Sequence, residues 1–164
     1  PIIYLANVCE EDLIGDNKYV EMVKEYSLKE NAKTIKICAK MECDLCEMSA
    51  EEKLEMLNAV GIEESGLDSL IKTTYELLGL ETFFTVGKDE VRAWTYKKGM
   101  TAKKCAGIIH TDFEKGFIKA EVVSYNDFIS AGSWAGAREK GLARLEGKDY
   151  IVEDGDIMLF RFAN

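Results

Sequence analysis

Long hydrophobic runs, histidines and export signals are scarce or missing in this 164-residue sequence. No apolar stretch approaches the roughly 18 to 20 residues that span a bilayer, which excludes a membrane-spanning helix. The N-terminus lacks the basic segment, apolar core and A-x-A site of a secretory signal peptide. The chain begins with Pro1 rather than methionine, so we expect a fragment or a processed product.

Only five cysteines are present, an odd number that fits a reducing cytoplasm better than a disulfide scaffold. Cys38, Cys43 and Cys46 have the spacing of the first three ligands of a plant-type [2Fe–2S] cluster, for which Cys9 or Cys105 would be the fourth ligand. This leaves a small iron–sulfur or redox protein as one alternative. The competing interpretation is that these are small apolar side chains around a strand end. Zinc is disfavoured because there is no second C-x-x-C pair.

A complete catalytic set is also missing. His110 is the single histidine, and with Asp112 it would form an acid–base pair or, alternatively, favour a helix C-terminus electrostatically. No second histidine or serine nucleophile completes a triad. The pattern G-x-x-x-x-G-K-[ST] does not occur, so these residues contain no phosphate-cradling loop of their own. We predict no catalytic residue and no metal ligand in this chain.

Charge is distributed unevenly. The composition, 47% hydrophobic and 31% charged with a net charge of −9, indicates a soluble folded protein. Residues 1–80 hold 8 Lys and Arg against 17 Asp and Glu, whereas residues 81–164 hold 13 against 13. An acidic protein binds nucleic acid poorly unless its cations are concentrated on one face. The cations of the second half do cluster, which predicts either a basic binding face or a solvated lysine-rich edge.

The first eighty residues predict a strand, a helix, a strand and two more helices, the order of a parallel α/β sheet. Asp16 or Asn17 is expected to cap the first helix. Ser49 and Glu52 form a capping box, S-x-x-E. The expected elements cover residues 2–6, 17–31, 33–38, 49–61 and 65–79.

From Leu80 the pattern changes to short aromatic and β-branched runs. "ETFFTVG" and "EVRAWTY" predict a hairpin, and "TAKKCAGIIH" predicts a short helix. "GFIKAEVVSY" predicts a strand, the next sixteen residues are irregular or short-helical, and "DYIVEDGDIMLFRF" predicts two strands around the turn "EDGD". This is the order of a ubiquitin-like β-grasp domain, and we place the boundary near residue 80.

The strand end "IIYLANVCEEDL" contains Asn7-x-x-Glu10. Ligands of open α/β sheets bind beyond the carboxyl ends of the strands. There a carboxylate can accept from the donor edge of a nucleobase, while an amide can both donate and accept. The alternative is a strand that simply enters a solvated turn.

The second half closely resembles the TGS domain at the C-terminus of the YchF family, the Obg-like ATPases. The motifs that carry this resemblance are "FFT-G--EVRAWT--KG-TA", "AG-IHTDFEKGFI-AEV" and "DYIVEDGDIM-FRF". In the first half, "IIYLANVCEEDL", "KICAKMECDL" and "EESGLDSLIKTTYELLGL" are similar to the same family. The resemblance therefore covers essentially the whole chain.

It implies two domains: residues 1–80 as the C-terminal remnant of an α/β P-loop GTPase domain, and residues 81–164 as an α+β β-grasp TGS domain. It also implies that Asn-x-x-Glu replaces the usual Asn-Lys-x-Asp and relaxes guanine readout toward adenine. Cys38 stands where the family usually has serine, and Lys103 and Lys104 replace the commoner Pro-Gln. The implied nucleotide-binding residues are Asn7, Val8, Glu10, Cys38 and Ala39. The candidate RNA- or partner-binding residues are Lys97, Lys98, Lys103, Lys104, Lys115 and Lys119.

The function implied by the resemblance is that of a cytoplasmic protein that binds and hydrolyses ATP or GTP with Mg²⁺ and associates with the ribosome or RNA, and not with membranes. The phosphate loop and switch regions would precede Pro1, so this chain alone is expected to be inactive and to hold no nucleotide. Its own contribution would be part of the base pocket and partner binding through the TGS domain. The alternative is a protein–protein interaction module with no nucleic-acid role.

Overall fold

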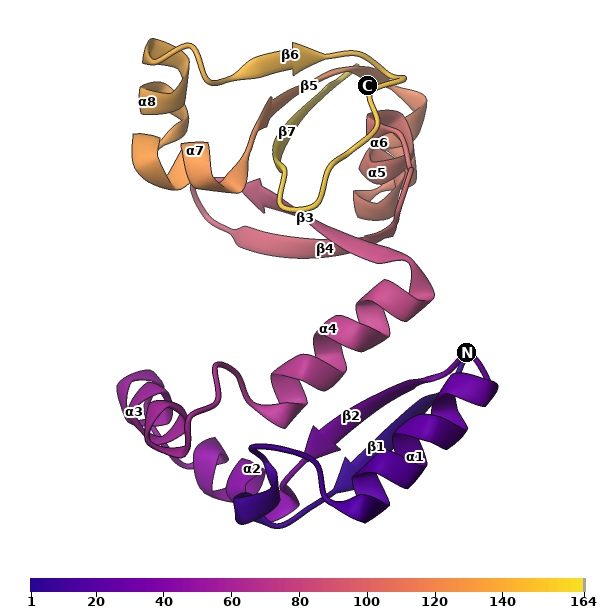
Figure 1. Ribbon diagram of the computed structural model, residues 1–164. Helices are drawn as coiled ribbons and strands as arrows, with labels where there is room; N and C mark the ends of the chain where they lie inside the picture. Colours follow the sequence, from indigo (N-terminus) through magenta and orange to yellow (C-terminus); the bar gives the residue numbers. More distant parts are fainter. Residues whose placement is uncertain (164) are drawn as a thin grey trace. The chain divides into compact units, whose positions relative to one another are not determined.

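The computed structural model describes residues Pro1–Ala163, and the chain divides into two compact units, Pro1–Leu78 and the residues from Gly79 onward (Figure 1). Asn164, the last residue of the second expected domain, lies outside the described residues. Within the described range, no helix combines the length and apolar character needed to cross a membrane.

The first unit is built on two parallel strands connected by a helix. The strands are in register from the pair Ile3–Lys33 to the pair Asn7–Ile37, so their carboxyl ends meet at one edge of the sheet. The mixed α/β character expected from the sequence is confirmed here. In chain order the elements are β1 (Ile3–Asn7), η1 (Glu10–Asp12), α1 (Lys18–Lys29), β2 (Lys33–Ile37), α2 (Ala39–Cys46), α3 (Ala50–Val60) and α4 (Gly66–Leu78).

Side-chain caps define the helix starts in this unit. The Asn17 Oδ1 atom accepts hydrogen bonds from the Tyr19 and Val20 amides, each at 3.0 Å. The capping box is present, since the Ser49 N–H donates to Glu52 Oε2 at 2.8 Å and the Glu52 N–H donates to Ser49 Oγ at 3.4 Å. These contacts satisfy amides that have no partner inside the helix, which is why the first turns form where the sequence predicts them.

Helix α2 was not predicted. Cys38 occupies its N-cap position but makes no side-chain capping hydrogen bond, so the usual local start signal is missing. The helix is stabilised instead by tertiary packing, because Met41 and Leu45 are buried against Leu57 of α3. Burial of this apolar face outweighs the weak local signal.

The second unit contains a five-stranded mixed sheet in the order β4-β3-β7-β5-β6. β3 and β7 are parallel and share the pair Phe84–Ile157, while the other neighbouring strands are antiparallel. The elements are β3 (Leu80–Val86), β4 (Val91–Lys97), α5 (Ala102–Ile109), α6 (Thr111–Lys115), β5 (Phe117–Val123), α7 (Tyr125–Ala131), α8 (Trp134–Glu139), β6 (Arg144–Glu146) and β7 (Ile157–Phe162).

Helices cover both faces of this sheet. Cys105 of α5 is buried with Phe83, Tyr96 and Met158 on one face. Successive residues of a strand point to opposite faces, so Ile157, next to Met158, lies in the second cluster with side chains of α7 and α8. This arrangement accounts for the burial of the last four residues of β5.

The expected pair of strands over residues 149–162 is wrong in its first half. Only β7 forms, and Ile151 makes an isolated bridge to Thr101. β5 pairs with β7 on one side and, on the other, with the earlier segment β6, which is too short for its alternation to be recognised in the sequence. α7 and α8 are short helices that largely coincide with the segment expected to be irregular or short-helical, and α6 lies in a segment for which no element was predicted.

Candidate functional site

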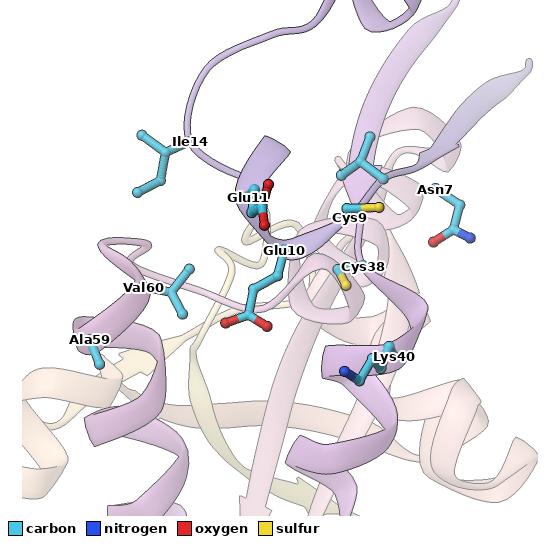
Figure 2. Close-up of a pocket in the computed structure, with 10 residues that line it drawn as sticks. Asn7, Cys9, Glu10, Glu11, Ile14, Cys38, Lys40, Ala59 and Val60 are labelled. Carbon is cyan, nitrogen blue, oxygen red and sulfur yellow. The ribbon is translucent and has the colours of Figure 1, made fainter.

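A cavity of about 690 Å³ lies at the carboxyl ends of β1 and β2 (Figure 2). The loop after β1 is tied to the neighbouring strand, because the Val8 N–H donates to the Ile37 carbonyl at 2.8 Å. The cavity lies where open α/β sheets place their ligands. Its lining residues are Asn7, Val8, Cys9, Glu10, Glu11, Ile14, Cys38, Lys40, Ala59 and Val60.

Asn7, the last residue of β1, contacts the start of α2. Its Oδ1 atom accepts a hydrogen bond from the Ala39 N–H at 3.1 Å. Ala39 is the first residue of α2, so Asn7 caps that helix from another element and compensates for the missing cap at Cys38. The side-chain oxygen of Asn7 therefore links the end of β1 to the start of α2.

Glu10 provides the acidic group of the cavity. It begins the short helix η1, which follows extended backbone at Cys9. In Figure 2 its carboxylate points into the space bordered by Val60 on one side and by Cys38 and Lys40 on the other. A carboxylate in this position can accept hydrogen bonds from ring N–H or amino groups of a planar ligand.

The remaining wall was not predicted from the sequence. Ile14 lies in the same loop as Glu10, and Ala59 and Val60 come from the last turn of α3. Lys40 immediately follows the predicted Cys38 and Ala39. Its position just after a strand end could therefore have identified it as a cavity residue from the sequence. No local pattern marks α3 as part of a site, because its contribution depends on tertiary packing. The lining thus combines apolar side chains with four polar ones, Asn7, Glu10, Glu11 and Lys40, a mixture that can hold a heterocycle with hydrogen-bonding edges.

The five predicted nucleotide-binding residues thus lie at one edge of the first unit. Asn7, Val8, Glu10 and Cys38 line the cavity, and Ala39 is connected to it through the hydrogen bond to Asn7. Cys38 is buried, so its side chain contributes packing rather than a polar rim.

The cysteines do not assemble into a cluster. Cys43 and Cys46 are exposed on α2, Cys38 is buried ahead of that helix, and Cys105 is buried in the core of the second unit. Among residues Pro1–Ala163 no group of three or more Cys, His, Asp or Glu side chains could hold a metal ion. The iron–sulfur alternative consequently has no ligand set in the described part of the chain.

His110 has a local role at the junction of α5 and α6. Its Nδ1 atom accepts a hydrogen bond from the Asp112 N–H at 3.2 Å and so caps α6. Asp112 Oδ2 lies 3.5 Å from the same nitrogen, and both side chains are exposed. The predicted proximity of His110 and Asp112 is correct, and it results from a helix start rather than a cavity.

The candidate lysines of the second unit are partly neutralised by carboxylates. Lys98 lies 2.9 Å from Glu81, and Lys104 lies 2.6 Å from Glu114. Lys115 lies 4.0 Å from Asp112. Lys97, Lys103 and Lys119 belong to β4, α5 and β5 respectively, and Lys119 is opposite Arg161 of β7. Three of the six candidate cations, Lys98, Lys104 and Lys115, therefore lie next to carboxylates.

Comparison with known proteins identifies similar sequences over the whole chain. The family model YchF-GTPase_C, described as "Protein of unknown function (DUF933)", matches residues 80–163. The "Ribosome-binding ATPase YchF" of Bacillus subtilis is 55% identical over 164 residues, which cover 99% of this chain and 45% of that protein. "Obg-like ATPase 1" of Gallus gallus is 48% identical, covering 99% and 41%.

Solved structures agree with these matches. The Schizosaccharomyces pombe YchF GTPase superposes with a TM-score of 0.83 at 36% identity and covers 98% of this chain and 43% of that one. A GTP-binding protein from Pyrococcus horikoshii OT3 has a TM-score of 0.67 at 21% identity, which shows similarity of fold. The chain spans less than half the length of each of these proteins.

Proposed function

This chain belongs to the YchF/Obg-like ATPase family, and we propose that it supplies the C-terminal part of a protein that binds and hydrolyses ATP or GTP and associates with the ribosome. Within that protein, residues 1–80 contribute the base-recognition wall of the nucleotide site. Residues 81–164 form a TGS domain that binds the partner. The names of the relatives support the activity and the ribosome association.

The observation that carries the nucleotide role is the cavity at the ends of β1 and β2. Asn7, held by the Ala39 N–H, fixes the mouth of the cavity, and Glu10 turns its carboxylate inward. Paired polar groups discriminate strongly between bases, because a wrong base leaves a buried donor or acceptor without a partner. Backbone N–H contacts near Cys38 do not depend on the side chain, so cysteine can replace the usual serine there.

The phosphates and Mg²⁺ would be bound by groups beyond these 164 residues. The sequence contains no G-x-x-x-x-G-K-[ST] loop. The described residues also offer no cluster of acidic side chains for a metal ion. We therefore propose that this chain contacts the base of the nucleotide and takes part in no step of phosphoryl transfer.

The strand order of the second unit supports the TGS assignment. Relabelled from β3 as the first strand, β4-β3-β7-β5-β6 becomes 2-1-5-3-4, with α5 following the first hairpin and packed on one face. Parallel pairing of the first and last strands at the centre is the arrangement of a β-grasp domain. An exposed sheet edge and the six candidate lysines are the surfaces that a ribosomal partner would meet.

The nucleotide assignment can be tested with Glu10→Gln and Asn7→Ala in the full-length protein that contains this chain. Each variant should weaken ATP or GTP binding by about tenfold, the cost of leaving a charged or polar group unsatisfied. Glu47→Gln is the matched control, because Glu47 is exposed at the end of α2 and lies outside the cavity lining. Unchanged dissociation constants for both site variants would refute the proposal.

Ribosome binding can be tested by cosedimentation with charge reversals at Lys97/Lys98 and Lys103/Lys104. Loss of binding together with a steep salt dependence would indicate contacts to RNA phosphates. Binding that survives these reversals and changes little with salt would favour the second candidate, a docking domain for protein. The ion pairs of Lys98 and Lys104 are the observation that favours this second candidate.

A further inference from the structure

The ammonium group of Lys36 donates hydrogen bonds to a loop of the candidate site, although Lys36 does not line the cavity. Lys36 lies on β2, and its side chain is 18% exposed. The Nζ atom donates to the carbonyl oxygens of Leu13 at 2.8 Å and Asp12 at 3.2 Å. It also donates to the Gly15 carbonyl and lies 3.2 Å from Asp16 Oδ1.

These four oxygens belong to one short segment. Residues 8–17 connect β1 to α1, and this segment carries half of the cavity lining, including Glu10 and Ile14. Three of the oxygens that Lys36 contacts are main-chain carbonyls, so the contacts depend on the course of the backbone rather than on side-chain identity. A single ammonium group thus fixes the half of the loop that follows Glu10.

Further contacts hold the ends of this segment. The Val8 N–H is bound to the Ile37 carbonyl, and Asn17 Nδ2 donates to Asp12 Oδ2 at 2.9 Å. Asp16 pairs with Lys24 of α1 as well as with Lys36, and these hydrogen bonds lower the pKa of Asp16. Within the segment, the Asp12 N–H donates to the Cys9 carbonyl at 3.0 Å and the Leu13 N–H donates to the Glu10 carbonyl at 3.1 Å. Lys36 adds the contacts that tie the carbonyls of Asp12, Leu13 and Gly15 to β2.

We propose that Lys36 is a positioning residue for base recognition, which holds the Glu10 loop in the conformation that accepts the nucleobase. This inference rests on the proposed function of the cavity. Hydrogen bonds from charged donors are roughly twice as strong as neutral ones, so the loop is well ordered before the ligand arrives. Preorganisation of this kind increases affinity because less loop entropy is lost on binding.

The test compares Lys36→Met with wild type in the full-length protein that contains this chain. Met keeps the apolar stem and removes the ammonium group. ATP should bind on the order of tenfold more weakly, since several charge-assisted hydrogen bonds that order the loop are lost. Inorganic tripolyphosphate, which has no base, should bind as it does to wild type. Amide hydrogen exchange should accelerate within residues 10–16 and stay unchanged in β1.

Two further variants separate positioning from general stability. Lys33→Met is the matched control, because Lys33 lies on the same strand and pairs with Glu76, away from the loop. It should leave ATP binding unchanged. Lys36→Arg keeps the charge and several donors and should restore much of the affinity. If Lys36→Met does not fold, Lys36→Gln, which keeps one donor group, should show a smaller loss of the same kind.

Three results would overturn the inference. ATP binding by Lys36→Met equal to that of wild type would show that the loop needs no ammonium group. An equal loss for ATP and tripolyphosphate would show a general structural defect. If wild type, Asn7→Ala and Glu10→Gln all bind ATP with the same affinity, the proposed function fails first and the inference fails with it.

Discussion

The ion pair between the buried Glu121 and the half-exposed Arg138 offers the sharpest test of the energetics of the second unit. Glu121 of β5 is 7% exposed. Arg138 of α8 donates to both of its carboxylate oxygens, from Nε at 2.6 Å and from an Nη at 2.8 Å. Arg161 is farther away, at 3.8 Å. Replacing Arg138 with Met therefore leaves a carboxylate on the sheet face without its bidentate partner.

The expected cost follows from the burial of the two partners. Breaking a fully buried pair by removing one member costs about 3–5 kcal/mol. The Arg138 side chain is 47% exposed, so water can reach the abandoned carboxylate. We expect a loss of about 2–3 kcal/mol once this solvent screening is included. For a unit of this size that corresponds to a fall in melting temperature on the order of 10 °C.

The pair Lys104–Glu114 is a matched control. Its nitrogen–oxygen distance is also 2.6 Å, but its side chains are 64% and 31% exposed. Lys104→Met should cost less than about 1 kcal/mol, as exposed pairs do. The conservative substitution Arg138→Lys should recover part of the loss seen with Arg138→Met, because it keeps the charge but not the fork geometry of the guanidinium.

The pH dependence adds a second check. The hydrogen bonds from Arg138 hold the pKa of Glu121 below its usual value. A lowered pKa in the folded state gives stability that is present above the unfolded value, about 4.3, and is lost as pH falls through the folded one. The difference between wild type and Arg138→Met should therefore shrink in acid. Urea unfolding at several pH values measures it, and a loss no larger than that of Lys104→Met at neutral pH would refute the reasoning.

Three further changes have defined outcomes. Burial raises the pKa of Asp156 in the folded state. Its contribution to stability therefore falls as pH rises from the unfolded pKa, about 3.9, through the pKa of the folded state. Asp156→Asn should flatten this pH dependence of the unfolding free energy, as measured with urea. Ser49→Ala removes the capping box of α3 and should cost about 1 kcal/mol of unfolding free energy, with no loss if the cap is unimportant. Gly61→Ala should lower the free energy of unfolding by about 1–2 kcal/mol, because Gly61 has φ of 82°. It should also weaken nucleotide binding, because the new Cβ would lie 3.2 Å from Cδ1 of Ile14, which lines the cavity. Unchanged stability by calorimetry would contradict the first expectation.

The parts of the fold that follow local rules could be predicted from the sequence. Asn17 and Ser49 start helices because their oxygens satisfy nearby amides, and Gly61 ends one because it accepts a left-handed conformation. These are short-range effects, so one chain segment contains the whole signal. The hairpin of β3 and β4 belongs to the same class.

The elements that were missed depend on distant partners. α2 forms because Met41 and Leu45 pack against α3, and its N-terminus is capped by Asn7 from the end of β1. β6 is three residues long and is defined by pairing with β5. Neither partner can be identified from a window of the local sequence, since the contact exists only after the chain has folded.

The candidate site divides in the same way. Asn7 and Glu10 were predictable because a polar residue at a strand end and a carboxylate three residues later lie on one loop. Ala59 and Val60 were not, because α3 brings its last turn to the cavity through packing. Lys36 was missed for a different reason: as an alternating residue of a short strand it looks like an ordinary exposed lysine, and only the carbonyls around its Nζ reveal its role.

The paired lysines also limit how the second unit can contact RNA. A phosphate that approaches Lys98 or Lys104 competes with Glu81 or Glu114, which already lie within 2.9 Å and 2.6 Å. Each such contact exchanges one ion pair for another and leaves a carboxylate next to the incoming phosphate, so it gains less than contact with a free cation. Fewer phosphates are then neutralised than lysines are present, and the salt dependence of binding should be shallower than six lysines would give.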